Sequence, residues 1–293
     1  MLGYRFGNKA NFGDNTILSG SYQYVFGSGN SNSASHSMVG GIDNVVTSTA
    51  EESFVWGSGN NIASSNNLVG GVGNVLLDRG DFNLIAGYQC SGAGGTDYNI
   101  IAGYNNFSTS KGNITWGRNN VNDYDEWGMG YHAVGGSGNT VSGSFFGLTV
   151  GEDNVHPTGF KSGIQMGKDG TSPNNKTGAI STAAGKFAAN GDAQLTTHIV
   201  HTGATTDATP TVITNDGSSW ALAENDSVIV KATVLGRKAG DAGQSVAYEV
   251  ISAFKRQGAT STIGTTGVTQ RILNQDTGMT ACDATLAVND SSD

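Results

Sequence analysis

Val55-Trp56-Gly57-Ser58-Gly59-Asn60 is followed fourteen residues later by Val69-Gly70-Gly71-Val72-Gly73-Asn74, and the same order of apolar residue, glycine and asparagine recurs along the first half of the chain. We call the central glycine of each repeat the pivot glycine, and consecutive pivots lie 14 or 16 residues apart. The pivots of this regular series are Gly13, Gly27, Gly41, Gly57, Gly71, Gly87, Gly103 and Gly117. A fixed short period of this kind predicts a solenoid with one coil per repeat.

A half-period is also visible, because Gly13, Gly20 and Gly27 lie seven residues apart. Two halves predict two short strands, each of about four or five residues, and two turns per coil, which makes a flattened β-roll. Glycine at the pivot provides a positive φ or room for the neighbouring coil, and the recurring asparagines suit left-handed turns and amide ladders. The apolar residues just before the pivots are expected to stack in columns inside the roll: Phe26, Val39, Val55, Trp56, Val69, Ile85, Ile101 and Trp116.

The composition excludes several classes of protein. Glycine accounts for 45 of the 293 residues, but with only three prolines and no three-residue period the chain is not collagen. With 13% charged residues and regularly placed apolar ones, the chain is not expected to be disordered. A net charge of −9 disfavours a nucleic-acid partner. No apolar run reaches the roughly 18 residues of a membrane span, so no membrane insertion is expected.

The glycine repeat fades towards the last third of the chain, where the sequence pattern changes. We expect a β-roll domain over residues 1–169, a Gly/Ala/Ser/Thr-rich linker over residues 170–194, and a small antiparallel β-sandwich over residues 195–293. Alternating β-rich runs at residues 227–235 and 245–254 support the sandwich. The chain stops soon after a predicted strand, which suggests that this second domain is truncated.

Two sets of motifs carry a resemblance to known families. The steps Gly57-Ser58-Gly59-Asn60 and Ala102-Gly103-Tyr104-Asn105-Asn106 resemble the left-handed β-roll of trimeric autotransporter adhesin heads and the Gly/Asn/Ser-rich rolls of phage tail fibres. The second segment resembles a module at the C-terminal ends of phage tail-fibre proteins. Its matching stretches are Gly191-Asp192-Ala193-Gln194, Thr205-Thr206-Asp207-Ala208-Thr209-Pro210-Thr211, and Ala247-Tyr248-Glu249 through Phe254-Lys255-Arg256.

The resemblance implies a parallel homotrimer that attaches a virion to the surface of its host. Its implied partners are further copies of itself, other virion tail proteins, and a host glycan or protein receptor. Its implied location is the tail fibre, and it is extracellular once released. The alternative is the head of a bacterial trimeric adhesin, but such a protein needs a signal peptide, a coiled-coil stalk and a membrane anchor, and none of these is found in the sequence.

One departure from the repeat suggests a binding site. Between Gly117 and Gly136 the step lengthens to 19 residues, and the extra segment is acidic and aromatic. Its candidate receptor- or glycan-binding residues are Asp123, Tyr124, Asp125, Glu126 and Trp127. Aromatic rings can stack on a sugar, while paired carboxylates also suit calcium or the acid and base of a glycosidase. The alternative is a solvated acidic loop whose aromatic side chains fold back on the roll.

No other motif indicates chemistry. Gly70-Gly71-Val72-Gly73-Asn74 is similar to the calcium-binding repeat G-G-x-G-x-D, but Val75 occupies the position of the aspartate ligand. No nucleophile elbow and no Cys/His signature is present. We therefore predict no catalytic residues, no metal site and no cofactor, and expect a structural, receptor-binding protein. The alternative from another class is a tailspike-type polysaccharide depolymerase, with carboxylates on the roll face or between subunits.

Overall fold

A computed structural model describes residues 4–6, 9–77, 81–93, 97–109, 111–123, 131–142, 146–156, 162–171, 177–186, 189–199, 227–238, 243–257, 260–263 and 267–286. The chain divides into two compact units, Met1–Ile199 and Val200–Asp293. Apart from one 3-10 turn, η1 (Thr277–Met279), the regular secondary structure of the described residues is β. The expected fold class, an all-β chain with a β-roll solenoid followed by a small antiparallel β-sandwich, is confirmed for the solenoid and for the antiparallel strands, while the described strands of the second unit form a single sheet.

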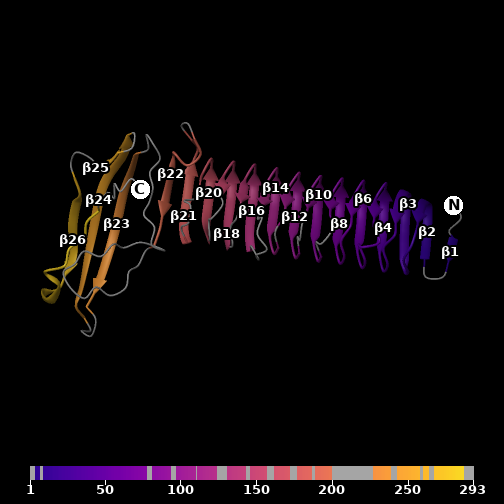
Figure 1. The fold of residues 1–293 in the computed structure, drawn as a ribbon, viewed down its shortest axis with the longest axis horizontal. Coiled ribbons are helices and arrows are strands. Elements are labelled where there is room, and N and C mark those ends of the chain that lie inside the picture. The colour runs from indigo at the N-terminus through magenta and orange to yellow at the C-terminus, as the bar shows by residue number, and fades with distance from the viewer. Residues whose placement is uncertain are drawn as a thin grey trace. The chain divides into compact units, whose positions relative to one another are not determined.

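The first unit is a β-solenoid whose coils stack side by side (Figure 1). A representative coil consists of a five-residue strand, β6 (Phe54–Ser58), and a two-residue strand, β7 (Asn61–Ile62). Each pairs in parallel with its equivalent in the next coil, so that Gly57 lies opposite Gly71. The prediction of two strands per coil is confirmed, but the second strand is shorter than expected, because the turn at residues 63–67 leaves it only two residues.

The same pattern repeats along the unit. The long strands are β2 (Lys9–Ile17), β3 (Gln23–Asn32), β4 (Met38–Ile42), β6, β8 (Leu68–Val72), β10 (Leu84–Tyr88), β12 (Ile100–Tyr104), β14 (Ile114–Arg118), β16 (Tyr131–Ser137), β18 (Phe146–Glu152) and β20 (Ser162–Lys168). The short strands are β5 (Val45–Val46), β7, β9 (Val75–Leu76), β11 (Ser91–Gly92), β13 (Phe107–Ser108), β15 (Val121–Asp123), β17 (Thr140–Ser142) and β19 (Val155–His156). In β3 the two strands of a coil are continuous, since it pairs with both β4 and β5.

The pivot glycines are required by the close approach of neighbouring coils. Gly57 has a φ of +125°, and a Cβ built on it would lie 1.9 Å from the carbonyl oxygen of Gly71. The other pivots of the series lie equally close to the carbonyl oxygen of the following coil, at 1.8 to 2.2 Å from a built Cβ. Every coil therefore depends on a residue without a side chain at this one position.

The core consists of two columns of apolar side chains. The long strands contribute the residue two positions before each pivot, which is fully buried at Val39, Val55, Val69, Ile85 and Ile101, as expected. The short strands contribute Val46, Ile62 and Leu76. The prediction is wrong for Phe26, Trp56 and Trp116, which are partly or largely exposed. They directly precede a pivot, and successive side chains of a strand point to opposite faces.

Both ends of the solenoid sheet are bounded by antiparallel strands. β1 (Tyr4–Phe6) pairs antiparallel with β2, whereas the coils pair in parallel. At the other end, β21 (Thr177–Ala184) pairs in parallel with β20, and β22 (Gln194–Thr197) pairs antiparallel with β21. Residues 170–194, which the sequence suggests as a linker, thus include strands of the solenoid sheet.

The second unit contains an antiparallel sheet of four strands: β23 (Ser227–Arg237), β24 (Ser245–Gln257), β25 (Thr260–Ile263) and β26 (Thr269–Gln275). β24 is central and pairs with the other three. Its side chains Val246, Tyr248 and Val250 alternate onto one face and are buried against Met279 and neighbouring apolar residues. The β-rich runs predicted at residues 227–235 and 245–254 are confirmed as β23 and β24.

Candidate functional site

The predicted receptor loop begins at the end of β15. Asp123 is half-buried there, and its Oδ1 accepts a hydrogen bond of 2.6 Å from the Thr109 hydroxyl of the preceding coil. This bond ties the start of the loop to the solenoid. Tyr124, Asp125, Glu126 and Trp127 lie outside the described residues, so their grouping with Asp123 remains a prediction from the sequence.

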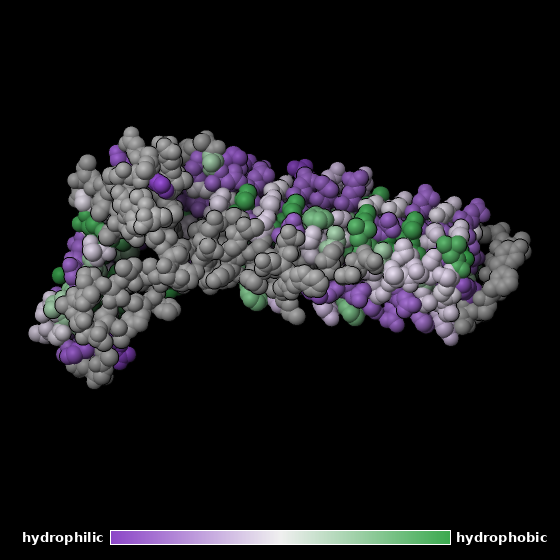
Figure 2. Space-filling model, in the orientation of Figure 1, coloured by the Kyte–Doolittle hydropathy of each residue, from purple (hydrophilic) through white to green (hydrophobic). Residues whose placement is uncertain are grey.

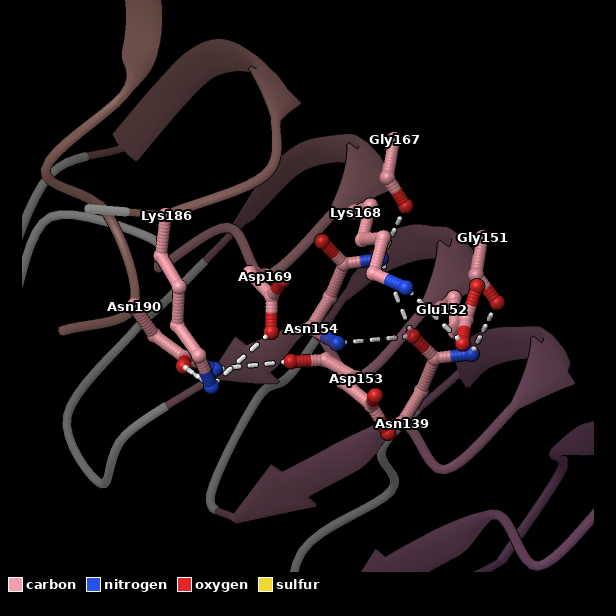
Figure 3. Close-up of polar contacts among 10 residues, drawn as sticks. All are labelled: Asn139, Gly151, Glu152, Asp153, Asn154, Gly167, Lys168, Asp169, Lys186 and Asn190. Carbon is pink, nitrogen blue, oxygen red and sulfur yellow. Dashed lines mark hydrogen bonds and ion pairs between the residues drawn. The ribbon is translucent and has the colours of Figure 1, made fainter. Parts of the chain in front are cut away.

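A ladder of buried asparagines fixes the turn that follows each pivot. The ladder residue lies three positions after the pivot, and its members are Asn30, Asn44, Asn60, Asn74, Asn106, Asn120, Asn139 and Asn154. Figure 3 shows two rungs, where Asn154 donates from its backbone N–H and from Nδ2 to Oδ1 of Asn139, both at 3.0 Å. Asn154 Nδ2 also donates to the carbonyl oxygen of Gly167, 2.9 Å away in the next coil.

The ladder satisfies groups that would otherwise be costly to bury. Each of these amides except that of Asn106 links three consecutive coils, and an unpaired buried polar group costs about 1–3 kcal/mol. The sequence prediction that the asparagines ladder their amides is confirmed by these bonds. The result is a stiff surface on which turns recur at a fixed spacing.

Cys90 occupies one rung of this ladder. Its backbone N–H donates to Asn74 Oδ1 at 3.0 Å, as an asparagine would, but its side chain is a weak donor that reaches the carbonyl oxygens of Gly103, at 3.4 Å, and Tyr88, at 3.8 Å. Burial raises the pKa of the Cys90 thiol, so the group stays protonated and unreactive in the folded chain. Its position indicates a structural role.

The core becomes polar towards the C-terminal coils. The long-strand column changes from Ile101 to Thr115, and further along Thr149 occupies it, while His156 occupies the short-strand column. His132 Nε2 lies 3.0 Å from the Thr149 hydroxyl, and the rings of His132 and His156 pack edge to face at 5.3 Å. Burial lowers the pKa of His132 to about 4 and, together with the charge of His132, that of His156 to about 3. Both rings are therefore neutral at pH 7.

The outer face of the long strands is apolar. Figure 2 shows hydrophobic side chains recurring along the solenoid in one view. Residues three positions before the pivots point outward and are about 40% exposed in coil after coil, as at Phe54 (39%), Leu84 (38%) and Ile100 (41%). Trp56 and Trp116, one position before their pivots, add to the same face.

Aromatic side chains also lie on the turn that precedes the long strand. Tyr22, Phe82 and Tyr98 have φ values of +56°, +61° and +60°, which bulky residues rarely adopt. Phe82 and Tyr98 stack with their rings 5.2 Å apart and nearly parallel. Together with Leu84 and Ile100 of the neighbouring strands, they line a shallow groove. The sequence analysis missed these residues, although they recur five positions before a pivot.

Charged side chains pair along the C-terminal coils. Lys168 lies 3.1 Å from Glu152 of the preceding coil, and Lys186 lies 3.1 Å from the buried Asp169 (Figure 3). Among the described residues, no group of three or more His, Cys, Asp or Glu side chains is arranged to hold a metal ion. No helix of the described residues is long and apolar enough to cross a membrane.

Comparison with known proteins does not assign the chain to a family. No protein-family model matches it, and the curated proteins contain no match.

Proposed function

We propose that this chain is a phage tail-fibre or receptor-binding protein that displays attachment loops on a rigid solenoid and assembles as a homotrimer. The observation that supports it best is the unbroken in-register stacking of coils held by the asparagine ladder. Such a scaffold keeps every turn at a fixed position, and three copies multiply weak contacts into useful avidity. The resemblance of the repeats and of the second segment to phage fibre sequences points the same way.

The receptor on this proposal is a surface glycan held by the acidic aromatic loop. Asp123 anchors the start of the loop through Thr109. Tyr124 and Trp127 supply ring faces for sugar stacking, and Asp125 and Glu126 supply acceptors for sugar hydroxyls.

Binding to a panel of purified bacterial surface polysaccharides tests this function. We expect the Tyr124→Ala/Trp127→Ala variant to lose at least tenfold in affinity, while Tyr104→Ala, which removes an exposed aromatic ring outside the loop, keeps the wild-type value. Equal affinity of both variants would overturn the loop assignment. Release of reducing sugar by the wild type, abolished by Asp125→Asn or Glu126→Gln, would replace the binding function with the polysaccharide depolymerase.

A further inference from the structure

The solenoid carries an exposed apolar surface that its own fold leaves uncovered. We call it the apolar face, and it combines the outward residues of the long strands with the turn aromatics. Its members, all exposed by 37 to 66%, are Tyr22, Tyr24, Phe54, Trp56, Leu68, Phe82, Leu84, Tyr98, Ile100, Ile114 and Trp116. Among the residues that line the groove within this face, Glu52 is the charged one, and it occupies the same turn position as Phe82 and Tyr98.

The apolar face is larger than folding of a monomer requires. Eleven large side chains, each exposing about half of its roughly 150–250 Å², present about 1,000 Å². The largest apolar patch on a typical monomer is about 300–600 Å², whereas a stable protein interface buries about 800 Å² per partner. The face is therefore large enough for a stable interface.

The backbone of the coils is shaped to keep this face flat. The ring of Trp56 lies over Gly40 of the preceding coil, where a built Cβ would come within 2.2 Å of the ring. Trp116 lies over Gly135 in the same way, at 2.1 Å. Glycine at these two outward positions allows each indole to lie along the sheet, and a flat sheet face can pack closely on another surface.

The turn aromatics expose large apolar rings at a strained position of the coil. At the equivalent turn position other coils have His36, Glu52, Asn66 and Gly112, with φ values of +53°, +55°, +60° and +73°. Asparagine and glycine adopt this conformation readily, whereas bulky side chains lose about 1–2 kcal/mol there. Phe82 and Tyr98 are exposed as well as strained. Glu52 and His36 adopt the same φ, so the strain belongs to the turn, and what distinguishes Phe82 and Tyr98 is that they expose large apolar rings there.

We propose that the apolar face is the surface on which copies of this chain pack side by side and in parallel. The argument rests on the homotrimer of the proposed function and names the part of the solenoid that forms it. Another copy presents ridges with the same coil spacing of about 4.8 Å, so contacts made at one coil repeat at each of the others. A partner with a different period would match at only one or two coils.

The charge pattern selects the parallel arrangement. Towards the C-terminal coils the long strands carry the ion pair of Glu152 and Lys168, both about half exposed. Parallel copies place these charged coils beside each other, where water still reaches them, and place apolar coils against apolar coils. Antiparallel copies would instead place Glu152 and Lys168 at the level of the coils of Tyr24 and Phe54, and this match of like coils would be lost.

The groove suits a ring of copies around one axis. The strand residues and the turn aromatics form two adjacent patches, and in a closed ring the two sides of each contact differ. The strand residues of one copy, such as Leu84 and Ile100, would pack against Phe82 and Tyr98 of the next copy. Every copy then uses both patches, which fits three chains.

Solution mass by light scattering at micromolar concentration tests the apolar face. We expect about three times the 30.0 kDa of one chain for the wild type. Leu84→Glu/Ile100→Glu should reduce the mass to one chain with an unchanged far-UV circular dichroism spectrum. The matched control, Val45→Glu/Leu77→Glu, places charges on exposed apolar residues outside the face and should retain the wild-type mass.

Crosslinking adds a readout that does not require a disruptive substitution. In a Cys282→Ser background, Ile100→Cys should form covalent dimers and trimers with a short bismaleimide, whereas Val45→Cys should not. A wild-type monomer would overturn both the homotrimer and the apolar face. If Leu84→Glu/Ile100→Glu remains a trimer, or if Val45→Cys crosslinks and Ile100→Cys does not, the apolar face is not the interface, although the homotrimer still stands. A wild-type protein that forms the trimer but binds no polysaccharide would refute the receptor loop and leave the apolar face as the interface.

Discussion

Replacing one pivot glycine by alanine should separate two coils of the solenoid. In Gly57→Ala the new Cβ would lie 1.9 Å from the Gly71 carbonyl oxygen, and real Cβ atoms do not come within 3.0 Å, so the coils must move apart by at least 3.0 − 1.9 = 1.1 Å. That movement lengthens the bond from Asn60 Nδ2 to Gly71 O, now 3.1 Å, beyond hydrogen-bonding range. Two or three lost hydrogen bonds at about 1 kcal/mol each, with about 1–3 kcal/mol of backbone strain, give about 4 kcal/mol.

Two neighbouring glycines provide matched controls for this change. Gly70 has open space and no positive φ, so Gly70→Ala should change the stability by less than about 0.5 kcal/mol. Gly59 also has open space but a φ of +65°, so Gly59→Ala should cost about 1–2 kcal/mol.

Thermal unfolding followed by circular dichroism distinguishes the three variants. At about 2–4 °C per kcal/mol, Gly57→Ala should melt about 8–16 °C below the wild type, and Gly59→Ala should lie between it and Gly70→Ala. If Gly57→Ala melted within about 2 °C of Gly70→Ala, the close approach of coils would not be what requires glycine at the pivots.

Three further predictions concern the buried polar groups. Asn60→Ala removes hydrogen bonds to both neighbouring coils and should lower the free energy of unfolding, measured in urea, by about 2–3 kcal/mol. Asn61→Ala, at an exposed position, should lower it by less than about 0.5 kcal/mol. Equal decreases for the two variants would contradict the role of the ladder. Cys90→Asn should restore the missing asparagine of the ladder and raise the unfolding midpoint. In the wild type, the buried Cys90 thiol should react with a thiol reagent only after unfolding, and rapid labelling of Cys90 in the folded chain would contradict its burial. His132 and His156 are neutral in the folded chain, whereas in the unfolded chain they take up protons below about pH 6.5. The free energy of unfolding should therefore fall by up to about 1.4 kcal/mol per pH unit per histidine between pH 6.5 and 4. His132→Asn should make this pH dependence less steep, and an unchanged slope would exclude His132 as its source.

Periodicity predicted the coil, the pivots and most of the core, because every coil repeats the same contacts. Val55 and Val69 could be placed in one column from their equal distance to a pivot. The exposure of Trp56 follows from the alternation of side chains along a strand, because Trp56 comes directly after the buried Val55. The length of β7 could not be derived from the half-period, because turn geometry decides how many residues remain for pairing.

The contact between His132 and His156 in the polar core could not be predicted from their spacing in the sequence. His132 and His156 are isolated in the sequence, yet they pack together because they lie in adjacent columns of nearby coils. Alignment on the pivots would have placed His132 four positions before Gly136, in the column of Asn113, to which its N–H donates a bond of 2.8 Å. The apolar face could have been found in the same way, whereas the grouping of Tyr124 to Trp127 depends on a loop for which the repeat sets no register.

The antiparallel strands at the two ends of the solenoid have a consequence for polymerisation. A stack of parallel, in-register strands resembles the growing tip of an amyloid fibril, which recruits further chains through its open edge. β1 lies opposite residues 9–11 and β22 opposite residues 180–183, and both run in the opposite direction to the coils, so a second solenoid cannot continue the parallel pairing at these residues. These strands therefore oppose end-to-end growth of the stack as the protein concentration rises.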